Sequence, residues 1–231
     1  MDWSRSGRYK PATRSRDSVV GDLSSDWSIV GTGDLNGDGT DDLVLRSSGG
    51  LIGEWKMPNG QAGAGTIGDI SSNWISAGVG DLTGDGTADL LFLRTDGTVA
   101  DWVINDGQEA SAHVLGNVGT MWSIVGLGDF DGSGHDDILF QSQSGDIAAW
   151  IMRNGAVAAV QSYGSPGPDW QVVGIGDYTG NGTDDILFRN TNGEMATWIM
   201  QNGQVSQTVV TGSITSEWQT APAPAATRIT S

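Results

Sequence analysis

Four short segments of the sequence place oxygen-bearing side chains at alternate positions between glycines. The first reads Asp-Leu-Asn-Gly-Asp-Gly-Thr-Asp-Asp at 34–42, and the pattern returns at 81–89, 129–137 and 177–185. Positions one, three, five and nine carry oxygen, and glycine fills positions four and six in every copy. Glycine allows sharp backbone turns that let alternate side chains converge on one point. Hard oxygen donors in flexible number select Ca²⁺.

We therefore expect each loop to bind one Ca²⁺, up to four in all, with position seven contributing its backbone carbonyl. The candidate ligands are Asp34, Asn36, Asp38, Thr40 and Asp42; Asp81, Thr83, Asp85, Thr87 and Asp89; Asp129, Asp131, Ser133, His135 and Asp137; and Asp177, Thr179, Asn181, Thr183 and Asp185. The fourth loop has two carboxylates among these positions and the others three, so we expect the fourth site to be weakest. The alternative is that Asp and Gly are ordinary turn residues; four copies in register favour ion binding.

Tryptophan reveals the repeat that must position these loops. A first series recurs at a near-constant interval and consists of Trp27, Trp74, Trp122, Trp170 and Trp218. A second series follows the first four members at a constant offset and consists of Trp55, Trp102, Trp150 and Trp198. Trp3 joins the second series if the chain begins inside a repeat, because Asp2-Trp3 resembles Glu54-Trp55.

Each repeat contains four short apolar segments and no helical spacing, which predicts an all-β β-propeller of four-stranded blades with 47–48-residue repeats. In the first repeat we expect strands at 27–33, 42–46, 51–57 and 61–68. The predicted full blades are 27–73, 74–121, 122–169 and 170–217, and residues 1–26 with 218–231 would form a composite fifth blade that closes the ring. The alternative is a fragment of a larger propeller.

The Ile-Val-Gly-x-Gly-Asp strand, the Gly/Asp loop and the following Asp-Leu/Ile-Leu strand resemble the FG-GAP or VCBS-type repeat. Such repeats form the calcium-loaded propeller of integrin α-chains and of a fungal lectin from Psathyrella. The resemblance covers residues 27 to about 212 and implies a calcium-binding propeller at an extracellular or cell-surface location. It does not specify an activity.

The composition of the chain argues against several classes of function. The net charge of −17 argues against nucleic acid as a partner, and no apolar run has the roughly 20 residues of a membrane helix. The chain lacks cysteine, and His113 and His135 fall in unrelated parts of their repeats without triad context, so we expect no enzyme.

The predicted function is therefore a recognition module with a glycan or a cell-surface protein as partner, in the first place a multivalent carbohydrate-binding, lectin-like propeller with its sites between the blades. The second Trp series, Trp55, Trp102, Trp150 and Trp198, offers candidate platforms for sugar rings between the blades. The alternative for these Trp residues is packing between blades, with a protein adhesion or scaffold role and no sugar binding.

Overall fold

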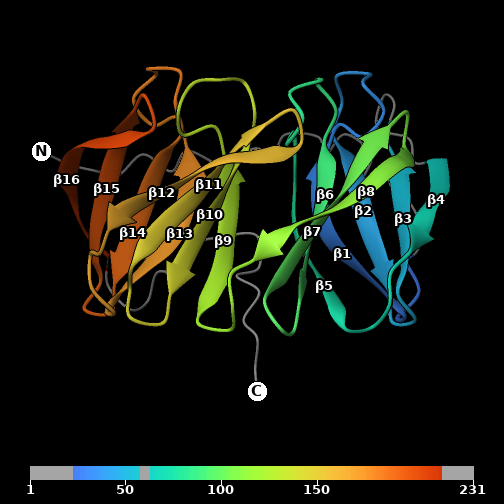
Figure 1. The fold of residues 1–231 in the computed structure, drawn as a ribbon, viewed down its shortest axis with the longest axis horizontal. Coiled ribbons are helices and arrows are strands. Elements are labelled where there is room, and N and C mark those ends of the chain that lie inside the picture. The colour runs from blue at the N-terminus through green and yellow to red at the C-terminus, as the bar shows by residue number, and fades with distance from the viewer. Residues whose placement is uncertain (1–22, 58–62, 215–231) are drawn as a thin grey trace, which may run out of the picture.

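The computed structural model describes residues 23–57 and 63–214, which contain sixteen strands in four antiparallel four-stranded sheets. These residues include no helix that could span a membrane. In each sheet the strands follow one another in chain order, so each sheet is one blade (Figure 1). Blade one consists of β1 (Trp27–Gly33), β2 (Asp42–Ser47), β3 (Leu51–Lys56) and β4 (Gly63–Asp69); blade two of β5 (Trp74–Gly80), β6 (Asp89–Arg94), β7 (Thr98–Asn105) and β8 (Gln108–Asn117); blade three of β9 (Trp122–Gly128), β10 (Asp137–Ser142), β11 (Ile147–Arg153) and β12 (Ala156–Gly164); and blade four of β13 (Trp170–Gly176), β14 (Asp185–Asn190), β15 (Glu194–Gln201) and β16 (Gln204–Ser213).

Tight turns hold the two outer strands of blades two, three and four together. Asn154 and Gly155 join β11 to β12, with φ of 50° and 74°, and Asp106-Gly107 and Asn202-Gly203 have the same paired positive values. Two consecutive positive φ angles define the type I′ turn, whose twist matches that of a hairpin and which favours Asn-Gly and Asp-Gly. These dipeptides therefore fix the register of the outer hairpins.

Blades pack by inserting an aliphatic side chain of one blade against a glycine of the preceding one. Val79 of β5 occupies the position that a side chain on Gly31 of β1 would take, since a Cβ placed there would lie 2.4 Å from Val79 Cγ2. Leu127 meets Gly78 and Ile175 meets Gly126 in the same way. The glycines that alternate along the first strands thus permit the close approach of neighbouring sheets.

Hydrogen bonds also join successive blades. The outer turn of each following blade donates to the loop after the preceding first strand: Gly107 N–H bonds the Leu35 carbonyl at 2.9 Å, and Gly155 N–H bonds that of Leu82 at 3.1 Å. Gln141 of β10 donates to the Trp170 carbonyl of β13 at 2.7 Å. These contacts fix the angle between sheets.

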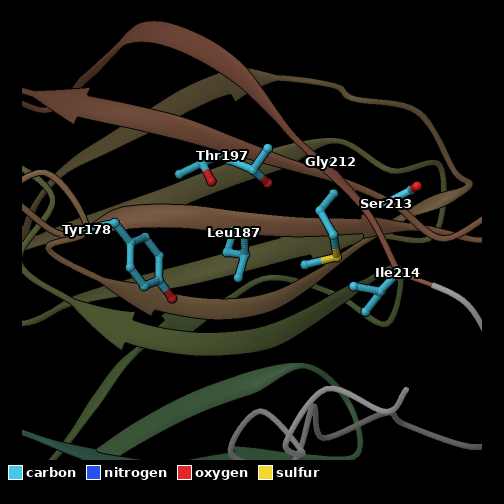
Figure 2. Close-up of a pocket in the computed structure, with 8 residues that line it drawn as sticks. Tyr178, Leu187, Thr197, Gly212, Ser213 and Ile214 are labelled. Carbon is cyan, nitrogen blue, oxygen red and sulfur yellow. The ribbon is translucent and has the colours of Figure 1, made fainter. Parts of the chain in front are cut away.

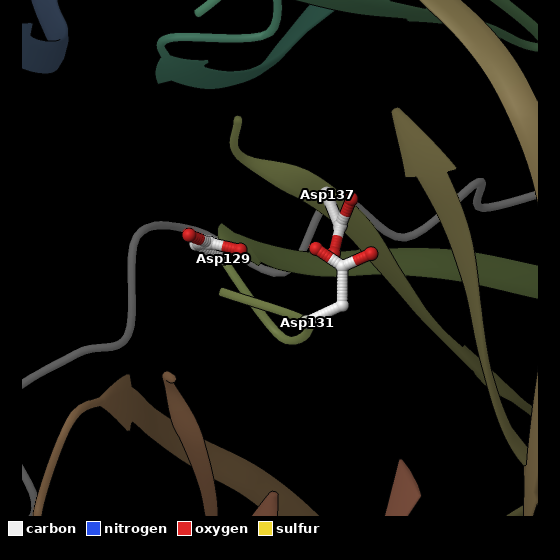
Figure 3. Close-up of side chains that lie close together, drawn as sticks. All are labelled: Asp129, Asp131 and Asp137. Carbon is white, nitrogen blue, oxygen red and sulfur yellow. The ribbon is translucent and has the colours of Figure 1, made fainter. Parts of the chain in front are cut away.

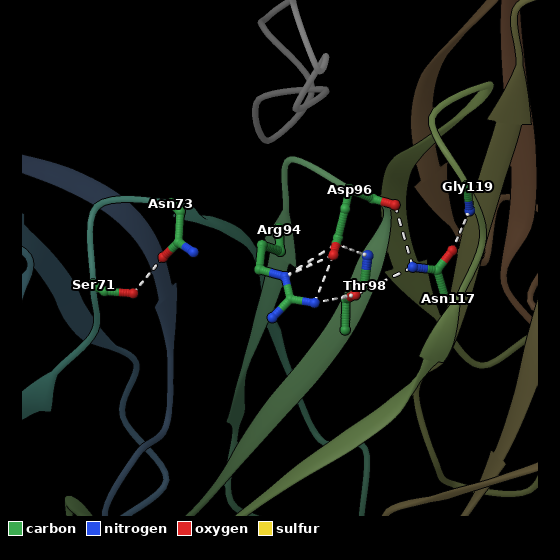
Figure 4. Close-up of polar contacts among 7 residues, drawn as sticks. All are labelled: Ser71, Asn73, Arg94, Asp96, Thr98, Asn117 and Gly119. Atoms are coloured by element: carbon green, nitrogen blue, oxygen red, sulfur yellow. Dashed lines mark hydrogen bonds and ion pairs between the residues drawn. The ribbon is translucent and has the colours of Figure 1, made fainter.

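A polar network lies at the turn between β6 and β7, at the end of blade two that is opposite its Gly/Asp loop (Figure 4). Asp96 accepts hydrogen bonds from Arg94 and from the Thr98 backbone N–H, and Asn117 of β8 donates to the Thr98 hydroxyl at 3.2 Å. The hydrogen bond from Arg94 is the main reason that the pKa of Asp96 lies below its usual value. Arg94 also lies 5.2 Å above the Trp74 ring, which ties the network to β5.

The prediction of four-stranded antiparallel blades, one for each repeat, is confirmed. In the first repeat the strands at 27–33, 42–47, 51–56 and 63–69 lie within a few residues of the expected ranges. The predicted closing blade, residues 1–26 with 218–231, lies almost entirely outside the described residues, so closure of the ring stays a prediction.

Candidate metal centre

The four Gly/Asp loops join the first and second strands of each blade, and all share one backbone geometry. In the first loop, the Asp34 carboxylate accepts N–H bonds from Gly37, Asp38 and Gly39 at 2.8, 3.2 and 2.7 Å. Gly37 and Gly39 have φ of 74° and 81°, which an L side chain would oppose. The carboxylates at 81, 129 and 177 make the same three contacts, so position one shapes the loop around itself.

The aspartate at position nine is fully buried and anchors the loop to the blade. Asp137 accepts N–H bonds from Met152 of β11 at 2.8 Å and from Phe130, the second loop residue, at 3.2 Å. Asp89 and Asp185 make the equivalent pair of contacts. In the first loop, Asp42 instead accepts from Met57 and from the Asn36 side-chain amide. Position nine is therefore structural as well as a candidate ligand.

The third loop brings three carboxylates together. Asp129, Asp131 and Asp137 each place an oxygen within 4.8 Å of the others, the only such acidic group in the part of the chain that is described (Figure 3). Burial raises the pKa of Asp137 to about 7, and the charges of Asp131 and Asp129 add to the shift. Three carboxylates at this separation repel one another until a cation or proton is bound.

The hydrogen bonding of the Asp131 carboxylate indicates whether the third loop could bind a cation. Its Oδ1 is buried without a hydrogen-bond partner, whereas its Oδ2 pairs with Arg153 of β11. Burial acts to raise the pKa of Asp131, but the hydrogen bonds from Arg153 and Ser133 lower it overall, so this group stays ionised. An unpartnered buried oxygen beside two further carboxylates fits a hard divalent cation.

The candidate ligands of the other loops make contacts within their own loops and blades. Asp89 has a pKa raised to about 7, first by burial and then by the charges of Asp85 and Asp81. The residue at position five accepts the backbone N–H of position seven in the loops at 34–42, 81–89 and 177–185. Thr87 and Thr183 at position seven also donate their hydroxyls to carbonyls of the third strand, at Ile104 and Met200. These side chains hold the loops against their blades.

Position eight carries a contact that the sequence analysis missed. The Asp136 carboxylate accepts the Asp81 N–H at 2.9 Å, and the Asp136 N–H donates to the Asp81 carbonyl at 2.7 Å. Asp184 clasps Asp129 in the same way, at 3.0 and 2.8 Å. Aspartate at position eight in three of the four copies was the available signal. Each of these two aspartates thus bonds its own loop directly to the loop of the preceding blade.

The second Trp series, which offers the candidate platforms for sugar rings, is largely buried in the structure. Trp102, Trp150 and Trp198 are each only 8% exposed and pack between blades. Their rings contact Phe92, Phe140 and Phe188 of the neighbouring strands, at centroid distances of 4.9, 5.1 and 4.8 Å. Trp55 is half-buried. The large apolar rings are needed to fill the space between sheets, and this burial supports the packing alternative.

Comparison with known proteins identified one family. The profile of the FG-GAP-like repeat matches residues 34–92, 81–140 and 129–188. A search of curated protein sequences gave no match. Among solved structures, the computationally designed Ika8 protein is similar at 14% identity and TM-score 0.40, covering 79% of this chain and 62% of that one. BBS1N, in a complex with ARL6DN, gives 17% identity and TM-score 0.43, covering 79% and 56%. The chain thus spans about three fifths of the length of these structures.

Proposed function

The chain belongs to the FG-GAP-like repeat family, and on that premise we propose that it is a calcium-stabilised propeller acting as an extracellular recognition module. The observation that carries the proposal is the third loop, where Asp129, Asp131 and Asp137 each place an oxygen within 4.8 Å of the others and one Asp131 oxygen is buried without a hydrogen-bond partner. These residues would hold Ca²⁺, which would neutralise their mutual repulsion. The three sister loops share its glycines and its position-one geometry.

Calcium in this design has a structural role. The position-nine aspartates connect the loop to the third strand, and the position-eight aspartates connect blades two to three and three to four. An ion held between these groups would stiffen the junction that orients each blade. A site at about a hundred times its dissociation constant contributes about 2.7 kcal/mol to folding stability. Extracellular calcium modules have dissociation constants of about 10⁻⁴–10⁻³ M, which suits the proposed location.

For the ligand we propose a protein on a cell surface, in an adhesion or scaffold role. Burial of Trp102, Trp150 and Trp198 supports this choice over a lectin, because a sugar ring needs an aromatic face that solvent can reach. Multivalent carbohydrate binding between the blades is the second candidate, with Trp55 as its half-exposed aromatic residue.

Two experiments test the proposal. Thermal unfolding of the full chain in EDTA, in calcium and in magnesium should show a rise in melting temperature that is specific to calcium; equal melting in all three would refute the metal role. A glycan array probed with the calcium-loaded chain separates the ligand classes. Silence with an intact fold agrees with a protein partner, and a signal that Trp55→Ala abolishes would establish the lectin instead.

A further inference from the structure

The outer face of blade four contains a pocket of about 420 Å³. Six residues that line it matter here: Tyr178, Leu187, Met195, Thr197, Thr211 and Gly212 (Figure 2). They come from the Gly/Asp loop and from β14, β15 and β16. The pocket therefore lies on the side of blade four that, in blades one to three, faces the next blade.

In the preceding blade, the residues at the same positions pack against a tryptophan of the next blade. Trp198 of blade four packs in one cluster with Phe130, Leu139, Ile147 and Ala149 of blade three. One repeat later in the chain, these four positions are Tyr178, Leu187, Met195 and Thr197, which line the pocket. The residues that line the pocket are thus the counterparts of those that pack against a tryptophan of the next blade.

In blades one and two, a glycine on the fourth strand lies directly against the indole of the next blade. A Cβ placed on Gly68 of blade one would lie 2.9 Å from Trp102 Cη2, and one on Gly116 of blade two would lie 2.8 Å from Trp150 Cη2. Gly212 occupies the same register position, opposite Met195, as Gly68 does opposite Ile52. No atom of the described residues lies within 4 Å of a Cβ placed on Gly212, and the same is true of Gly164 in blade three, the blade on which Trp198 packs.

The second loop residue distinguishes blade four from the other three blades. Leu35, Leu82 and Phe130, at the second loop position of blades one to three, are fully buried. Tyr178 at this position is 53% exposed, and its hydroxyl lies where a side chain on Gly174 would be. In the other blades an aliphatic residue of the next blade fills that place. Blade four is therefore shaped to receive another blade.

We propose that the indole of Trp3 from the N-terminal segment of this same chain fills the pocket on blade four. Eight of the ten tryptophans lie in the described residues, which leaves Trp3 and Trp218. Trp218 belongs to the first series, whose four described members each begin the first strand of a blade. Read as a chain that begins inside a repeat, the sequence places Trp3 in the second series, whose members at 102, 150 and 198 cover the preceding blade.

The sequence around Trp3 supports this occupant. An acidic residue precedes Trp3, as it precedes Trp55 and Trp102. The stretch from Trp3 to Trp27 is also slightly longer than the stretch from Trp55 to Trp74, which leads from a second-series Trp to the next first-series Trp. The chain between Trp3 and blade one therefore has the length of a normal fourth strand and its connections, with a few residues to spare.

The test uses the full chain with 5-fluorotryptophan and fluorine NMR. The Trp3 resonance is assigned by its loss in Trp3→Phe, a variant that keeps an aromatic ring at the site. We expect this resonance to lie outside the random-coil position and to resist a soluble paramagnetic agent at least about five-fold better than free tryptophan. Leu187→Ala, in the pocket wall, should shift the Trp3 resonance. Leu91→Ala, the equivalent change in blade two, is the matched control and should shift the Trp150 resonance while leaving that of Trp3 unchanged.

Two results would overturn the proposal. A Trp3 resonance at the random-coil position, fully accessible to the agent and unmoved by Leu187→Ala, would leave the pocket without this occupant. Protection that appears only at concentrations where sedimentation velocity shows a dimer would assign the pocket to a second copy of the chain. If both alanine variants unfold, Leu187→Val and Leu91→Val repeat the comparison with a smaller loss of volume.

Discussion

Asp137→Asn should change stability little without calcium and lower it clearly in calcium. Asp137 is fully buried, accepts N–H bonds from Met152 and Phe130, and lies beside Asp129 and Asp131. Asparagine has nearly the same shape but carries no charge. It can accept one of the two backbone bonds, and its NH₂ group faces the other N–H. The substitution therefore removes a candidate calcium ligand, a repelling charge and one hydrogen bond together.

The magnitudes can be worked out from these contacts. Burial and neighbouring charges raise the pKa of Asp137 from 3.8 to about 7, so its ionised form costs up to about 4 kcal/mol at neutral pH without metal. Asparagine removes this cost but leaves a buried N–H unpaired, at about 1–3 kcal/mol. The two effects largely cancel, and we expect the metal-free variant to melt within roughly 5 °C of the parent chain. In calcium, loss of a site worth about 2.7 kcal/mol should reduce the calcium-induced rise by roughly 5–10 °C.

The assay is thermal unfolding followed by tryptophan fluorescence at pH 7.5, in EDTA and in calcium, for the parent chain and for Asp137→Asn. Asp101→Asn is the matched control, because Asp101 is also fully buried with a pKa raised by burial but lies in β7, away from the loops. It should change the melting temperature equally in both conditions. If Asp137→Asn behaved as this control does, the assignment of the third loop to calcium would be wrong.

The remaining predictions concern pH, the blade junctions and the glycine contacts. In EDTA the protein should become more stable as the pH falls from about 7.5 towards 5, because burial raises the folded-state pKa values of three carboxyls to about 6–7, so that the folded state takes up protons first; these are Asp89, Asp136 and Asp137. In calcium the trend should reverse, since protonation displaces the ion, and urea unfolding across this range measures both. Asp136→Ala should lower the free energy of unfolding by about 1–3 kcal/mol in calcium, because the half-buried Asp81 N–H loses its carboxylate acceptor. Gly78→Val should cost about 1–3 kcal/mol or more in the same assay, because its Cβ would lie 2.9 Å from Leu127 Cδ1.

Each of these variants has a control. Asp169→Ala removes an exposed carboxylate that makes no side-chain contact with the described residues, and should stay within about 0.5 kcal/mol of the parent chain. Gly86→Ala adds a methyl group at a glycine with open space around it and a φ of 87°, so it separates backbone strain from the steric clash at Gly78. Metal-free stability that fell steadily on acidification would contradict the reasoning about the buried carboxyls. An Asp136→Ala variant as stable as Asp169→Ala would show that the junction bond contributes nothing.

The repeat made most of the blade architecture predictable. The tryptophan spacing located every described sheet, because a residue that fills the space between sheets must recur once per blade. In the first repeat, the strand ends were predicted within a few residues, since the Gly/Asp loop separates the first strand from the second. The oxygen pattern also identified the acidic cluster at Asp129, Asp131 and Asp137.

Contacts between blades were the part that sequence could not supply. A single repeat does not reveal that Asp136 reaches back to Asp81, because the two residues are 55 apart and lie in different sheets. The burial of Trp102 was equally hidden: a regularly spaced aromatic residue can either fill an interface or present a flat face to solvent. Only the neighbouring sheet, with Gly68 opposite the indole, decides between these alternatives.

The Gly/Asp loops are proposed to be calcium sites, and calorimetric titration of calcium into the EDTA-stripped full chain measures this binding itself. We predict heat from up to four ions per chain. The loop at 177–185 should fill last, because it has two carboxylates where the others have three. Asp177→Asn and Asp137→Asn should identify which step belongs to which loop. A titration with no heat beyond dilution, at calcium concentrations up to several millimolar, would contradict the claim and reduce the loops to turns.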